Sequence, residues 1–531
     1  MSMNSVAMPT TSTPNDSHGG QPPPLPSEFQ AEIDALAAER GCDPSDLAPL
    51  VESARAKGAK DRQLPGVLRQ ACARLMKLRS LGSRDPAGEF LNGGIAAAMA
   101  RAFEALRTGE AFSLDQADQA FGEALARCRR HQATSPEVIA SIGAAQAEVA
   151  AIRQDHRRAA ALYAEAAATP DLAQAAQWRY QHARAAALEE RGREYADNEA
   201  LEHSIELYEH TALPLARESE HPEHWSATQH ALGNALGIAG QRRRGIHYLE
   251  RSVAAFESAL QARTREHTPL DWAATQHGLG NALGILAQRQ GDADMLERAV
   301  AALDNALQVR SREQTPRDWA MTQYHLGTAL LALGQLKRDT AVLARSIDAY
   351  RLVLQEWTRE RAPLDWARTQ NSLGTALRVR GEQGNDPSEL EQAVAACRSA
   401  LAVWTRERWP DEWSMAQNNL GAALHRLGAR RNDVETLHEA IAAYGAALRE
   451  MRREDGPIAW AMTTANLGDA RRALAERARD AKMCRLAICD FEEVAKVFRE
   501  ASHPQYYDLA KERLAVARKL AAELDNPETV K

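Results

Sequence analysis

Apolar residues recur along most of the chain at the three- and four-residue spacing that marks one face of an α-helix. The clearest stretch carries Leu296, Ala299, Val300, Leu303, Ala306 and Leu307. A polar break, Gln290-Gly291-Asp292-Ala293, separates it from an equally helical stretch that precedes it. The alternation typical of β-strands is not apparent, so we predict an almost wholly helical chain built of helical hairpins.

A recurring tryptophan divides this pattern into units of constant length. It returns every 47 residues, at Trp225, Trp272, Trp319, Trp366, Trp413 and Trp460, and such a fixed period is typical of stacked-repeat proteins. A proline three residues before each tryptophan ends the preceding helix. Asp271, Asp318 and Asp365 directly precede a tryptophan, and we expect them to cap the helix that follows.

Three other positions never vary: Leu, Gly and Ala stand seven, eight and ten residues after each tryptophan. The glycines are Gly233, Gly280, Gly327, Gly374, Gly421 and Gly468. Glycine inside a helix costs about 1 kcal/mol relative to alanine, so its repetition predicts that a second helix approaches closely at this point. We expect the tryptophan to pack between neighbouring repeats.

These landmarks resemble the tetratricopeptide repeat (TPR) family. The match comprises Leu279, Gly280 and Leu283 in the first helix, and Ala299, Leu303 and Ala306 in the second. The unit exceeds the family's 34-residue form by 13 residues, and so looks more like the extended repeats of kinesin light chains and of bacterial signalling proteins. The resemblance implies an all-α, right-handed superhelical solenoid of helical hairpins whose first helices line a concave face.

The regular array does not cover the whole chain. We expect a Pro-rich disordered leader at 1–26, a helical region of unknown role at 27–110, degenerate TPR-like helix pairs at 111–221, the regular 47-residue array at 222–500, and a capping helix and tail at 501–531. The sequence leaves open whether the leader occupies the groove.

Composition excludes several classes of partner. The net charge of −7 argues against a nucleic-acid binder, which needs a basic face. Six cysteines are scattered without CxxC spacing, as expected of reduced thiols. We find neither a signal peptide nor an apolar run of membrane-spanning length. We therefore expect a cytoplasmic protein without a membrane partner; the sequence does not indicate its oligomeric state.

Motifs for catalysis were sought, and GxSxG, HExxH and GxxxxGK[ST] are absent. The glycines of GLGNALG lie in mid-helix and are expected to serve packing. His221 and His224 flank the Pro222-Glu223 corner, where two imidazoles could hold a metal ion. Because His224 takes the place of a helix-start residue and His230 that of a surface-facing position, we expect no metal. We predict no enzymatic activity and no cofactor.

Candidate binding residues occupy the variable positions that the resemblance places on the concave face. Asparagine and threonine there offer donors and acceptors to the backbone of an extended peptide, and two arginines could bind acidic groups. The predicted groove residues are His230, Asn234, His277, Asn281, Tyr324, His325, Thr328, Asn371, Thr375, Arg378, Asn418, His425 and Arg472. The alternative interpretation is a solvated surface without a dedicated ligand.

The sequence therefore predicts a non-enzymatic scaffold or adaptor that binds a partner peptide or protein in a concave TPR groove. The alternative is a sensor or regulatory subunit of a bacterial signalling or defence-type system, acting with a separately encoded effector. Nothing in the sequence identifies the partner or the pathway.

Overall fold

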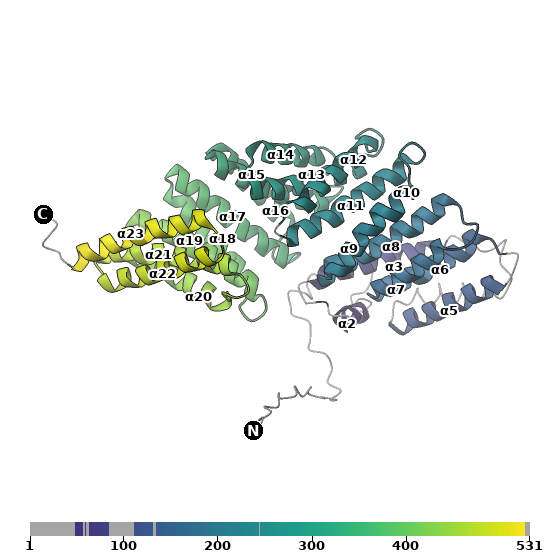
Figure 1. Ribbon diagram of the computed structural model, residues 1–531, viewed down its shortest axis with the longest axis horizontal. Helices are drawn as coiled ribbons and strands as arrows, with labels where there is room; N and C mark the ends of the chain where they lie inside the picture. The colour runs from purple at the N-terminus through teal and green to yellow at the C-terminus, as the bar shows by residue number, and fades with distance from the viewer. Residues whose placement is uncertain are drawn as a thin grey trace, which may run out of the picture.

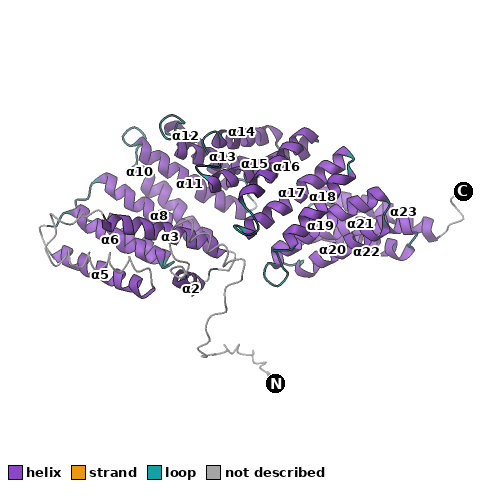
Figure 2. Ribbon diagram, turned by 180° about the vertical axis from the view of Figure 1, so that it is seen from behind, coloured by secondary structure: helices purple, strands orange, loops and turns teal. Residues whose placement is uncertain are grey.

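The computed structural model describes residues 48–56, 59, 63–83, 111–130, 134–243 and 245–525. In these ranges every regular element is a helix, as Figures 1 and 2 show. The helices follow an arch, with the α13–α14 region near its top and the two ends lower (Figure 1). The leader predicted at 1–26, most of 27–110 and the last residues of the tail lie outside the described residues.

The regular array is a stack of six helical hairpins. They pair α11 (Pro222–Arg242) with α12 (His247–Ala262), α13 (Pro269–Gln290) with α14 (Ala293–Leu307), α15 (Pro316–Lys337) with α16 (Thr340–Glu356), α17 (Pro363–Gly384) with α18 (Pro387–Leu401), α19 (Pro410–Arg431) with α20 (Val434–Glu450), and α21 (Pro457–Ala478) with α22 (Ala481–Glu500). Each second helix also packs against the first helix of the next hairpin. The described part of the chain is therefore an all-α solenoid of stacked helical hairpins, and α23 (Pro504–Asp525) closes it by packing on α22.

Helices before the array extend the same stack. They are α2 (Ala48–Ala56), α3 (Leu64–Ser83), α5 (Ala111–Arg130), α6 (Pro136–Ile152), α7 (His156–Ala167), α8 (Gln174–Tyr195), α9 (Asn198–Leu207), the π-helical turn η3 (Tyr208–Ala212) and α10 (Leu213–Leu215). Helices α6 to α9 pack in chain order as hairpins do. Helices α2 and α3 bury Leu50, Val67 and Leu68 in one core with α5 and α6.

The repeated glycine marks a close contact within each hairpin. A Cβ atom added to Gly280 would lie 2.6 Å from Leu303 Cγ, and one added to Gly327 would lie 2.9 Å from Tyr350 Cε1. The other four glycines of this column face large or sulfur-bearing side chains of their second helices at 2.7 to 2.9 Å. The predicted close approach is confirmed. The tryptophans are half-buried, and an arginine seven residues earlier lies over three of their rings, as Arg312 does over Trp319.

The prediction that Asp271, Asp318 and Asp365 cap the first helices is wrong. Helix α13 begins at Pro269, because proline's fixed φ suits the first helical residue, so Asp271 lies inside the first turn. The capping aspartates precede the second helices instead, and their side chains accept backbone N–H hydrogen bonds there. They are Asp292, Asp339, Asp386, Asp433 and Asp480, each following a residue with positive φ.

The first helices form one continuous layer. Helices α11, α13, α15, α17, α19 and α21 each contact the next first helix, whereas no pair of successive second helices between α12 and α22 has comparable contacts. Closer packing of the first helices curves the stack toward them. We call this set the inner layer. Across the described part of the chain, no helix is both long and apolar enough to cross a membrane.

Candidate functional site

Several predicted groove residues bond to the neighbouring hairpin. His230 Nδ1 lies 3.1 Å from Thr275 Oγ1, and His277 Nδ1 lies 3.1 Å from Thr322 Oγ1. Both threonines are fully buried and also donate to the carbonyl four residues earlier. These histidines therefore connect successive inner-layer helices, and their Nδ1 atoms are engaged within the protein.

The remaining polar positions form a similar network. The Oδ1 atom of Asn281 pairs with His325 Nδ1 at 2.8 Å. Across the next helices, Asn419 donates to Asn371 Oδ1 at 3.0 Å, and the Tyr324 and Ser372 hydroxyls lie 3.2 Å apart. Within single hairpins, Asn234 bonds to His230, and the hydroxyls of Thr328 and Thr375 each donate to a carbonyl four residues earlier. Much of the predicted asparagine and threonine ladder is thus partnered internally.

Burial keeps the inner-layer histidines neutral. Desolvation lowers the pKa of His325 to about 4 and of His230 to about 3, and it lowers the pKa of His277 well below its usual value. His425, which is 7% exposed, has its pKa lowered to about 3, first by burial and then by nearby arginines such as Arg426 and Arg472. Asn418 Oδ1 is buried without a hydrogen-bond partner among the described residues.

A cavity of about 940 Å³ opens between the C-terminal turns of α15, α17 and α19. We call it the basic cleft. Arg378 and Arg426 both pair with Glu382, at 2.5 and 3.2 Å. Two further arginines line the cavity, Arg338 and Arg430, and neither has an ion-pair partner among the described side chains. Four arginines thus face one carboxylate, in a chain whose net charge is −7.

A second cavity of about 510 Å³ adjoins the basic cleft, and both are lined by Gln335. We call it the apolar cleft. It lies between α13 and α15 and is lined mainly by Leu296, Leu331, Ala332 and Leu336, together with the predicted groove residue Thr328. Leu336 is 47% exposed. Of the predicted groove residues, Thr328 and Arg378 line these two clefts.

The C-terminal end of the inner layer is covered by the last helix. Arg513 of α23 forms an ion pair with Asp469 of α21 at 2.9 Å. The predicted groove residue Arg472 lies 4.0 Å from Asp469 and 3.9 Å from Glu476, so its guanidinium is only loosely paired. This end is less accessible than the clefts.

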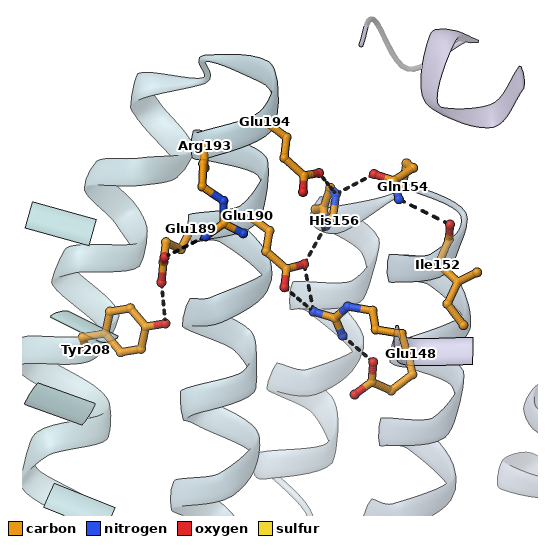
Figure 3. Close-up of polar contacts among 10 residues, drawn as sticks. Glu148, Ile152, Gln154, His156, Glu189, Glu190, Arg193, Glu194 and Tyr208 are labelled. Carbon is orange, nitrogen blue, oxygen red and sulfur yellow. Dashed lines mark hydrogen bonds and ion pairs between the residues drawn. The ribbon is translucent and has the colours of Figure 1, made fainter. Parts of the chain in front are cut away.

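The acidic N-terminal end of the stack, before the inner layer, contacts α3. Arg74 of α3 forms ion pairs with Glu148 of α6 and, at 2.8 Å, with Glu190 of α8. Figure 3 shows His156 between the carboxylates of Glu190 and Glu194, which lie 3.6 and 3.5 Å from its ring nitrogens. Sequence reasoning missed this network, which joins residues up to 116 positions apart.

The neighbouring carboxylate Glu189 faces the other side of α8. It accepts a hydrogen bond from the Tyr208 hydroxyl at 3.1 Å and pairs with Arg193 at 3.3 Å (Figure 3). Burial raises the pKa of Glu189, and Arg193 opposes that shift. The acidic end is therefore internally compensated, and α3 supplies part of the compensation. The open part of the inner layer lies between α11 and α19.

Comparisons with known proteins give little beyond the architecture. No protein-family model matches the chain, and no curated protein matches it. Among solved structures, a Rap protein complexed with competence and sporulation factor aligns at 10% identity and a TM-score of 0.35, covering 73% of this chain and 100% of that one.

Two other structures align at similar levels. A human IFIT1 dimer with PPP-AAAA has 14% identity and a TM-score of 0.31, covering 85% of this chain and 95% of that one. Yeast Tom70 has 11% identity and a TM-score of 0.24, covering 84% and 96%. Because these TM-scores lie below 0.5, the account of the site rests on this chain's own residues.

Proposed function

We propose that this protein is a non-enzymatic scaffold that binds a segment of a partner protein across α13 to α19. The segment carries an aliphatic side chain for the apolar cleft and carboxylates for the basic cleft. The observation that carries the proposal is the adjacency of these two cavities on one face, with Gln335 lining both. Together they span three successive hairpins and part of a fourth.

The charges in the basic cleft favour an anionic ligand. Glu382 neutralises at most one of the two arginines that share it, which leaves Arg338 and Arg430 to meet incoming carboxylates. Guanidinium groups bind carboxylates through paired, charge-assisted hydrogen bonds. An overall acidic protein that concentrates arginines in one cavity presents a local field opposite in sign to its net charge.

The neighbouring apolar cleft favours a protein segment over RNA. Single-stranded nucleic acids bind through aromatic side chains on which bases stack, and neither cleft has an aromatic residue in its lining. An exposed leucine beside a cavity suits an aliphatic anchor instead. The bound segment would lie against residues of the predicted set, namely Thr328 and Arg378.

Peptide display on the intact protein tests the proposal. We expect selected peptides to combine one or two aliphatic residues with an acidic cluster. Counter-selection uses Arg338→Ala/Arg430→Ala, which removes the two arginines without an ion-pair partner. The matched control is Arg345→Ala/Arg398→Ala on the second helices α16 and α18, where the arginines pair with Asp304 and Glu439. Enrichment that is identical on all three proteins, or binding of RNA in preference to every peptide, would refute the proposal.

A further inference from the structure

The corner that begins the regular array brings three metal-ligating side chains together. His221, Glu223 and His224 each offer a ligand atom, and these atoms all lie within 4.8 Å of one another. His221 Nδ1 lies 3.8 Å from Glu223 Oε1, and His224 Nε2 lies 3.9 Å from the same oxygen. Ligands held about 2.0 to 2.2 Å from a tetrahedral zinc ion stand roughly 3.5 Å apart. Small side-chain rotations therefore suffice to enclose an ion.

This corner differs from every later corner of the array. The corresponding residues in the next hairpin are Thr268, Leu270 and Asp271. In the four hairpins after it the corresponding triplets are Thr315, Arg317 and Asp318; Ala362, Leu364 and Asp365; Trp409, Asp411 and Glu412; and Gly456, Ile458 and Ala459. Histidine occurs at none of these positions. Among the six corners of the array, the first one alone therefore carries two histidines, and a glutamate lies between them in the sequence.

We propose that His221, Glu223 and His224 bind a first-row divalent transition metal ion, of which Zn²⁺ is the best fit. Two imidazoles and one carboxylate are a donor set that zinc accepts, with the fourth position left to water or to a group from a partner. From the sequence we expected no metal, because His224 takes the place of a helix-start residue; the structure adds Glu223, whose carboxylate lies near both histidines. The site lies outside the clefts and does not depend on the proposed function.

The preceding hairpin holds one of the ligands in place. The His224 ring stacks on Trp178 of α8, with centroids 3.7 Å apart and planes 13° from parallel. Trp178 is itself fixed by donating to Thr228 Oγ1 at 3.0 Å. A pre-positioned ligand reduces the ordering that metal binding requires.

Two charges oppose a cation here and set its expected class. The N-terminus of α11 carries a partial positive charge, and the Arg179 guanidinium is close enough to repel a cation at His224. Of the three ligands, Glu223 is the one whose negative charge offsets them. Hard cations such as Mg²⁺ and Ca²⁺, which need several oxygen ligands, are therefore not expected to bind, whereas imidazole-binding ions are.

Titration of the metal-free full chain with ZnCl₂ by calorimetry tests the site. We expect the wild type to bind one equivalent of Zn²⁺. Binding should be lost in His221→Thr/His224→Asp, which installs the residues of the next corner and is therefore expected to fold. Glu223→Leu should weaken binding, while His247→Gln, at an exposed histidine in the same hairpin, should leave it unchanged. Unaltered stoichiometry and affinity in the double variant, or no binding by the wild type, would overturn the proposal.

A spectroscopic readout locates the ion independently. Ni²⁺ or Cu²⁺ bound to His224 would lie against the Trp178 indole and quench its emission. Quenching should follow the calorimetric saturation curve, be lost in the double variant and be reduced in Trp178→Phe, where Trp225 beside His224 remains. Quenching that persists unchanged in the double variant would place the ion elsewhere, among the chain's other histidines.

Discussion

Two glycines on α13 provide a sharp test of the packing account, because they lie one helical turn apart on the same face. A Cβ at Gly280 would meet Leu303 Cγ at 2.6 Å and the Ala299 carbonyl oxygen at 3.0 Å. A Cβ at Gly284 would have as its nearest neighbour Ala299 Cβ at 4.0 Å, an ordinary contact. Leu303 is fully buried, so it has little room to move. Alanine should therefore fit at Gly284 but not at Gly280.

The magnitudes follow from these distances. Gly284→Ala gains the helix propensity of alanine, about 0.5 to 1 kcal/mol. Gly280→Ala gains the same propensity but overpacks the hairpin, at a cost of about 1 to 3 kcal/mol. The difference between the two variants isolates the overpacking effect. We therefore expect Gly284→Ala to be more stable than Gly280→Ala by about 1 to 3 kcal/mol.

Hydrogen exchange of the amides in α13 and α14 is the suitable assay. Stability in a repeat array is local, so a global melting temperature averages over hairpins that the substitutions do not touch. Protection of these amides should rise in Gly284→Ala and fall in Gly280→Ala relative to the wild type. Equal protection in the two variants would refute the close-approach explanation of the repeated glycine.

Three more predictions follow from polar groups. Burial lowers the pKa values of His182, His230, His325 and His425 to about 3 to 4, below the unfolded value of 6.5. The free energy of unfolding should therefore be highest above pH 6.5 and fall as the pH decreases toward 4. Thermal melts that do not change between pH 7.5 and 4.5 would contradict this expectation. Arg74→Ala leaves Glu148 and Glu190 without their partner and should weaken the docking of α3 by roughly 3 to 5 kcal/mol, seen as faster exchange in residues 63–83 but not in α13. Asp339→Ala removes the cap of α16 and should lower its local stability by about 1 kcal/mol, whereas the first-turn substitution Asp318→Ala, which removes no capping bond, should have a smaller effect on α15.

The sequence predicted the helical hairpins because their determinants are local and repeated. The apolar spacing around Leu303 and the recurring tryptophan both define one repeat unit, and the same pattern occurs in six units. The glycine column also revealed the contact inside a hairpin, because glycine in mid-helix requires compensation. Aspartates such as Asp292 share the 47-residue period, but the proline before each tryptophan is the stronger sequence signal of a helix start, so the caps were predicted there instead.

The candidate surface was harder to predict, because it depends on how one hairpin sits against the next. His230 and Asn371 were correctly expected on first helices, yet their partners Thr275 and Asn419 lie 45 and 48 positions away. Arg378 was identified from its column. The sequence did not single out Arg338, Arg426 and Arg430, because they lie near the C-terminal ends of the first helices, beyond the positions expected to face the groove. Only the stacking brings them together.

The contact between Arg74 and Glu190 shows the same limitation over a longer range. Neither residue belongs to a motif, and their pairing depends on where α3 meets the stack. The converging ligands at His221 and His224 were visible as two histidines, but the place of Glu223 beside them follows only from the turn geometry.

The central claim is that the clefts on the inner layer bind an acidic, aliphatic protein segment. Fluorescence anisotropy of a peptide selected by display measures this most directly. The proteins compared are the wild type, the cleft variants Arg338→Ala/Arg430→Ala and Leu336→Asp, and the second-helix control Arg345→Ala/Arg398→Ala. We expect the cleft variants to lose about tenfold or more in affinity, since each charge-assisted hydrogen bond contributes about 1.5 to 3 kcal/mol, and the control to bind as the wild type does. Equal affinity for the wild type and both cleft variants would contradict the account.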